Sequence, residues 1–338
     1  MTPLFLPSPR GPWSRWVLDA MTGFDSAPPG PRPDGESDDA QFALYLCYEV
    51  QYAGLPGTEH LEWNPTLIEA RRHLEGAFEA ALRQRIAATP TTPDRSSRSR
   101  RATPQSIGRL VGELLDADDG PSLSRFVEHE GTIEHMRDII LHRSPYQLKE
   151  GDPHTAGIQR LTGRAKQVLV EIQAGEYGTD APGQRMHSEL FADTMYVFGL
   201  DPTPNAYLDV LPGSAFAISN LISMFGCNRR WRGALVGQLA AFEMTSVAPM
   251  RRYARGLERL GVPARARRFY EVHVMADAEH EVMALEMVAA QCRQEPSTAV
   301  DIIFGVESTL VVERWFAEGL LDEWADRLPH DRRRLVSV

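Results

Sequence analysis

Residues 269–281, FYEVHVMADAEHE, hold two histidines and one aspartate at regular intervals. His273 and Asp277 are four residues apart, and His280 follows three residues later. A helix turns by about 100° per residue, so these intervals place all three side chains on one face. Imidazole and carboxylate groups on one face can bind transition metals. The histidines would lie about 10 Å apart along the axis, so the pattern favours two ions with Asp277 between them.

A chance alignment of polar side chains on a surface helix would give the same pattern, so further ligands are needed to support a metal site. Residues 167–191 supply a second set of candidates. Glu176 ends an apolar helical stretch and His187 begins the next. Glu171 and Glu189 compete with them, but Glu189 is expected to be exposed, and Glu171 lies about 140° around the helix from Glu176.

The segment SPYQLKEGDPHTAGIQRL, residues 144–161, supplies a third set. Glu150, Asp152 and His154 are all possible ligands here. Asp152 could instead cap a helix that has Pro153 at its first position, and His154 would then be a polar group near the start of that helix.

The elements that must position these residues are predicted to be helices. Turn sequences such as DADDGP, LDPTP and RLGVPA separate apolar stretches with helical periodicity, and no run of alternating strands is apparent. The predicted helices span residues 40–53, 63–88, 107–116, 121–142, 154–174, 184–198, 203–225, 230–257, 263–292 and 297–325.

Together, the three segments resemble the haem-oxygenase-like diiron oxidases and oxygenases, a superfamily that includes the iron-containing redox enzymes. The resemblance rests on YQLKEGDPHT, on EIQAGEYG followed by RMHSELF, and on FYEVHVMADAEHE. Their order and separation match a carboxylate helix, a Glu–His pair and a His–Asp–His helix. The earlier segments ALYLCYEVQYAG and EWNPTLIEARRHLEGAFEAALR are similar to the lead-in of bacterial members, so the resemblance extends from about residue 40.

The resemblance implies six metal ligands, shared between two iron ions. Glu176, His187 and His280 would hold one ion, and Glu150, His273 and Asp277 the other. Glu176 and Asp277 are the candidate catalytic residues. Three carboxylates against two ferrous ions leave a net charge of +1, which makes burial of the centre tolerable.

Four more residues are candidates to orient the ligands: Tyr177, Arg185, Tyr270 and Glu243. Glu243 lies in the largely apolar segment QLAAFEMTSVAPM. It either faces the site or is a charged group on a half-exposed helix face.

The resemblance also implies an all-α fold, a haem-oxygenase-like helical bundle with an N-terminal helical extension. Residues 1–37 are expected to be a flexible leader rich in Pro and Gly, and 38–90 to be helices that pack on the core. Residues 91–106 would form an Arg/Ser-rich linker, and 107–328 the diiron domain.

The implied function is a non-haem diiron oxidase or oxygenase that uses O2 as co-substrate. It would N-oxygenate, hydroxylate or fragment a small amino-acid-like or fatty-acid-like molecule, in specialised biosynthesis. One alternative is a non-catalytic or cofactor-free helical relative that binds a small molecule or metal. A haem-dependent relative and a zinc hydrolase are weaker alternatives.

Bulk properties limit the partners and the compartment. The net charge of −10 argues against a nucleic-acid partner or a polybasic membrane-binding protein. No apolar run is long enough for a membrane span, and the first residues do not resemble a signal peptide. Cys47, Cys227 and Cys292 form no CxxC pair or disulfide framework. We therefore expect a soluble cytoplasmic protein, and a homodimer as the common default.

Overall fold

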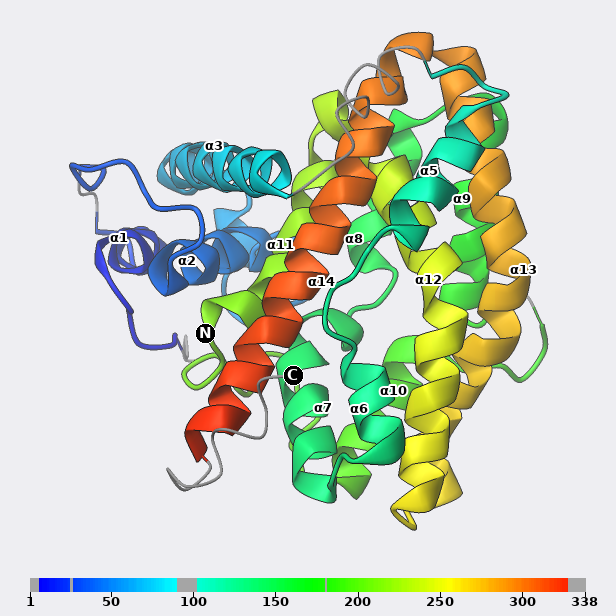
Figure 1. Ribbon diagram of the computed structural model, residues 1–338. Helices are drawn as coiled ribbons and strands as arrows, with labels where there is room; N and C mark the ends of the chain where they lie inside the picture. Colours follow the sequence, from blue (N-terminus) through cyan, green and yellow to red (C-terminus); the bar gives the residue numbers. More distant parts are fainter. Residues whose placement is uncertain (1–5, 25–26, 90–101, 180, 328–338) are drawn as a thin grey trace.

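The computed structural model describes residues 6–24, 27–89, 102–179 and 181–327. Within these ranges the chain folds into helices without any strand (Figure 1). The predicted all-α class is therefore confirmed. None of the described helices combines the length and the apolar character that crossing a membrane requires.

Seven of the longer helices form the bundle. α12 runs along both α13 and α14, and α9 and α10 pack against α13 (Figure 1). These helices are α7 (Ile133–Gln147), α9 (Gly163–Glu176), α10 (His187–Val197), α11 (Gly213–Cys227), α12 (Arg232–Arg259), α13 (Ala264–Gln294) and α14 (Ala299–Arg327).

Two glycines allow α12 and α14 to approach backbone to backbone. A β-carbon on Gly237 would overlap the carbonyl oxygen of Ile302, and one on Gly305 would overlap that of Ala234. Neither position has room for a side chain, so the separation of the two helices is fixed by main-chain contact.

Shorter elements lie between the longer helices of the chain. They are α5 (Ile107–Asp116), α6 (Leu123–His129), α8 (Asp152–Thr155) and the 3₁₀ turns η1 (Glu59–Leu61), η2 (Ile158–Arg160), η3 (Arg229–Trp231) and η4 (Pro296–Thr298).

Three predicted helices differ most from the structure, because they are divided or much shorter. The stretch 121–142 divides into α6 and α7, because Thr132 caps α7 by accepting a hydrogen bond from the His135 amide. The stretch 154–174 divides because Gly163, the first residue of α9, has a positive φ of 52°. The stretch 203–225 is helical only from Gly213, which follows the N-cap residue Pro212.

An N-terminal layer of three helices packs against α11. It consists of α1 (Pro12–Met21), α2 (Asp38–Glu49) and α3 (Pro65–Ala88), with α2 in contact with α1, α3 and α11. Nearly the whole of α2 is buried, from Ala40 to Glu49. This layer lies to one side of the bundle (Figure 1).

The expectation of a flexible leader over residues 1–37 is wrong for the part that α1 occupies. Trp13 and Trp16 are 5% and 3% exposed and belong to the hydrophobic core. Burial of these aromatic rings outweighs the helix-breaking composition on either side. Of the predicted linker over 91–106, only 102–106 lie within the described residues.

Candidate metal centre

Glu150 lies in a tight turn between two helices. α7 ends at Gln147, and Gly151, with a positive φ of 93°, precedes α8. The carboxyl group is buried at 8% exposure. With its amide nitrogen turned toward Glu150, Gln147 donates hydrogen bonds to both carboxylate oxygens, at 2.7 and 3.0 Å. The turn therefore directs a buried, partly satisfied carboxylate into the bundle.

Glu176 and His187 come from the facing ends of two consecutive helices. Glu176 is the last residue of α9 and His187 is the first residue of α10. Both are buried, and His187 Nδ1 lies 2.9 Å from Glu176 Oε2.

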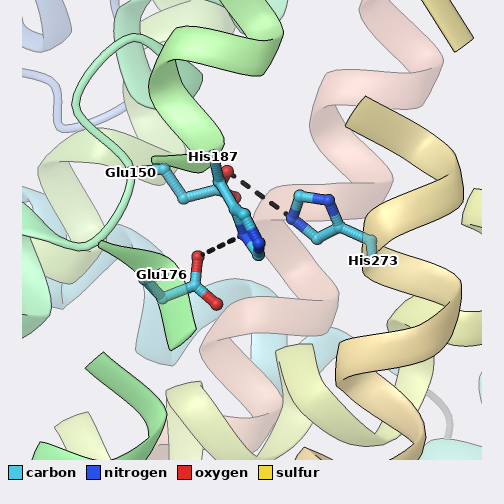
Figure 2. Close-up of side chains that lie close together, drawn as sticks. All are labelled: Glu150, Glu176, His187 and His273. Carbon is cyan, nitrogen blue, oxygen red and sulfur yellow. Dashed lines mark hydrogen bonds and ion pairs between the residues drawn. The ribbon is translucent and has the colours of Figure 1, made fainter. Parts of the chain in front are cut away.

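His273 approaches the same place from α13. Its Nδ1 lies 2.8 Å from the carbonyl oxygen of Phe269, so the ring donates there and directs Nε2 inward. Nε2 lies 3.6 Å from Glu150 Oε2. Figure 2 shows both histidines and both glutamates pointing toward one another from α7–α8, α9, α10 and α13.

The ligand atoms form two groups. Glu150, Glu176, His187 and His273 each offer one atom within 4.8 Å of the others, and Glu176, Glu243 and His280 do the same. Glu176 belongs to both groups. This arrangement differs from the one that the resemblance implies, because His187 and His273 lie together and His280 lies with Glu243.

Glu243 was expected at most to support the ligands. The structure places its carboxylate, on α12, 3.3 Å from Nδ1 of His280 and leaves it 6% exposed. The available signal in the sequence was a single acidic residue within an apolar stretch. Periodicity alone could not decide whether that residue faced the centre.

Asp277 lies on α13 between His273 and His280, but its side chain is outside the described part of the structure. Its role as a ligand therefore stays a prediction.

Burial and the imidazoles act in opposite directions on the carboxyl groups. Burial raises the pKa of Glu150, and nearby His273 offsets part of this effect. Burial also disfavours charge on Glu176, but the fields of His187, His273 and His280 prevail and lower its pKa. Buried carboxylates are costly without positive partners, so this centre suits a cation. Mixed imidazole and carboxylate donors suit several transition metals, and iron is one of them.

The competing ligands from the sequence lie elsewhere. Glu171 is exposed and forms an ion pair with Arg164 at 2.9 Å. Glu189 is likewise exposed, with Arg185 at 3.4 Å. His154 is buried but lies 2.6 Å, through Nε2, from the amide oxygen of Gln238.

The remaining orienting candidates have different partners. Tyr177 donates to Asp152 at 2.8 Å, so it connects α9 to α8. Arg185 is on the surface with Asp193, at 2.6 Å. Tyr270 is buried and lines a cavity beside the centre.

That cavity has a volume of about 520 Å³. Its lining includes Glu150, Glu176, Glu243 and His273 of the centre, and also the exposed residue Asp119. The wall also carries aromatic side chains, among them Tyr146, Phe242, Tyr253 and Tyr270, and the ion pair of Arg143 with Glu313.

The Arg143–Glu313 pair is bidentate, with N–O distances of 2.7 and 2.5 Å. The pair lines the same cavity as the carboxylates of Glu150, Glu176 and Glu243. A molecule in the cavity could therefore contact the pair and the carboxylates at the same time.

Residues 137–314, more than half of the chain, match the sequence profile of the family described as iron-containing redox enzymes. The chain belongs to this family. The matched region contains every member of both ligand groups and excludes the N-terminal layer of α1, α2 and α3. The expected family is thus confirmed.

A solved structure supports the fold of this family member. A CADD-like protein of unknown function from Nostoc punctiforme superimposes with a TM-score of 0.52 at 14% sequence identity, over 67% of this chain and 98% of its own. At this identity the likeness shows the helical fold alone. None of the curated proteins matched the sequence.

Proposed function

We propose that the protein is a non-haem diiron oxidase or oxygenase that uses dioxygen to oxidise a small amino-acid-like or fatty-acid-like molecule. The observation that carries this proposal is the position of Glu176, whose carboxylate belongs to both groups of buried ligand atoms. A shared carboxylate suits two neighbouring ions better than one.

Glu150, His187 and His273 would hold the first ion with Glu176, and Glu243 and His280 the second. Asp277, if it also binds, brings the number of carboxylates to four. Their four negative charges would balance two ferrous ions, which makes the buried centre neutral. When bound, iron supplies the electrons for reducing dioxygen, a chemistry that the side chains lack.

The protein side chains would hold the metal ligands in a fixed orientation and exclude water from the centre. The carbonyl of Phe269 fixes the tautomer of His273, and Gln147 holds the carboxylate of Glu150. The buried and half-buried aromatic residues of the cavity wall would limit the access of water to the bound substrate.

The cavity suggests how a substrate would be oriented. Its aromatic wall accommodates an apolar chain, and the Arg143–Glu313 pair presents both signs of charge to a polar end group. With its polar end at this pair, the molecule would lie in the cavity that the metal-binding carboxylates also line.

The test is anaerobic loading with Fe(II), followed by measurement of iron per chain and of oxygen consumption with panels of amino acids and fatty acids. We expect about two iron ions per chain and oxygen uptake that depends on one panel member. The Glu176→Gln variant and zinc-loaded protein are the controls, and both should lack the uptake. Full uptake by either control, or a single ion per chain in the wild type, would contradict the proposal.

The same protein samples distinguish the proposed enzyme from a non-catalytic relative and, after addition of haem, from a haem-binding relative. Tight iron binding with no oxygen uptake on any substrate would favour a binding protein. A Soret band after addition of haem would favour the haem-dependent alternative.

A further inference from the structure

Lys149, the neighbour of Glu150, is a half-buried lysine in a chain with only two lysines. Its side chain is 12% exposed, and its ammonium group contacts the carboxylate of Glu49. The ammonium also lies 4.2 Å from the ring centroid of Tyr45 and 5.0 Å from that of Tyr52. The charge is thus enclosed by residues of α2 and of the turn that follows it.

Glu49, at the end of α2, is equally well enclosed. Its side chain is 2% exposed, and the Asn205 amide donates to it at 2.6 Å. Asn205 in turn accepts a hydrogen bond from the Tyr45 hydroxyl at 2.8 Å. Gly54 leaves the space that the carboxylate occupies, because a β-carbon there would overlap Glu49 Oε2. These partners hold the pair in one arrangement.

A buried ion pair is weak evidence for added stability, because desolvating both groups offsets most of their attraction. A buried ion pair is better explained when it holds a neighbouring residue in one conformation. The residue that Lys149 would fix is Glu150, which lies in a turn and not within a helix, so helical hydrogen bonds do not determine its direction.

The other side of the same turn is also anchored. Gly151 packs so closely on Tyr177 that a β-carbon would be 3.2 Å from Cζ. The Tyr177 hydroxyl donates to Asp152 at 2.8 Å. The turn is therefore tied to α9 after Glu150 and to α2 before it, with Glu150 between the two attachments.

We propose that Lys149 and Glu49 form a positioning pair that holds Glu150 at the metal centre. The proposal rests on the proposed diiron function. It makes α2, which lies outside the region matched by the family profile, a working part of the centre. Glu49 and Lys149 would act through the direction of Glu150 and would not touch an ion.

The test is a Co(II) titration of the full chain, followed by the visible absorption bands, which report the coordination geometry of each ion. The main variant is the double substitution Glu49→Gln with Lys149→Met, which leaves no unpaired buried charge. We expect one of two Co(II) ions to bind about 10–100-fold more weakly, as is usual when a partner of a ligand is lost. The band of the other ion should be unchanged.

Two further variants sharpen the test. Glu49→Gln alone keeps the shape of the side chain and should act in the same direction with a smaller effect. The matched control is Glu36→Gln with Arg85→Met, which removes another ion pair of the N-terminal layer, one with an N–O distance of 3.1 Å. This control should titrate like the wild type.

A double-mutant cycle decides whether the pair acts through Glu150. In a Glu150→Gln background, removing the Lys149–Glu49 pair should have little further effect on Co(II) affinity. Additive losses, equal weakening of both ions, or wild-type affinity in the double variant would each overturn the positioning role alone. A wild-type chain that bound no Co(II) would overturn the diiron proposal as well.

Discussion

Gly175 of α9 lies directly against the imidazole of His280 on α13. A β-carbon at position 175 would be 3.0 Å from Nε2 and 3.1 Å from Cε1 of that ring. The glycine therefore leaves space for a candidate ligand of the second ion, one residue before the shared carboxylate of Glu176.

The substitution Gly175→Ala should weaken metal binding without lowering the stability of the fold. Alanine favours a helix interior over glycine by about 1 kcal/mol, so the helix itself should not be weakened. The methyl group should displace His280 and reduce the affinity for one ion at least about tenfold. Thermal denaturation and metal titration measure the two effects. Gly112→Ala in α5, where a β-carbon meets no atom within 4 Å, should leave binding unchanged.

Glu176 and Glu243 should differ in how many ions depend on them. Glu176→Gln is expected to weaken both ions, and Glu243→Gln only one, by about 100-fold or more. Iron retained per chain after anaerobic gel filtration measures the difference. Glu171→Gln, on the same helix as Glu176 but exposed, is the control. Equal losses in the Glu176 and Glu243 variants would contradict the shared position of Glu176.

His154 should make the metal-free protein less stable in mild acid. Burial lowers the pKa of this histidine in the folded state, although its contact with Gln238 opposes the shift. The unfolded chain then binds more protons, so stability falls as the pH drops below about 6.5, toward the folded pKa. The slope from this group is at most about 1.4 kcal/mol per pH unit. Urea denaturation between pH 5 and 8 measures it, and His154→Gln should flatten the curve. An unchanged slope in the variant would refute the assignment.

Trp16 should be essential to the stability of the N-terminal layer. Removing a buried aromatic ring typically costs about 3–5 kcal/mol, so Trp16→Ala should strongly lower the free energy of unfolding. Trp63→Ala removes the same ring at a position that is 77% exposed, and should change it by no more than about 0.5 kcal/mol. Similar values for the two variants would mean that α1 does not belong to the core.

The long helices were predictable because their signal accumulates over many residues. The predicted stretches 230–257, 263–292 and 297–325 agree with α12, α13 and α14 to within about two residues at each end. The ten residues of α1 lie between Pro- and Gly-rich flanks, where composition outweighs periodicity. The two tryptophans were the available signal for that helix.

The site was predictable only where ligands share a helix or a sequence pattern. The spacing of His273 and His280 identified the face of α13 that the structure directs to the centre. Glu243 comes from a different helix, and its position depends on how α12 packs against α13. Local sequence carries no record of that packing angle, so the direct contact between Glu243 and His280 had to come from the structure.

The main-chain contact at Gly237 and Gly305 has a consequence for substrate selection. α12 and α14 both line the cavity, and where their backbones touch there is no flexible side chain whose rearrangement could widen the gap. We therefore expect the distance between these two helices to stay the same when a molecule enters the cavity. The width of the cavity would then select molecules by their cross-section before any charged group is recognised.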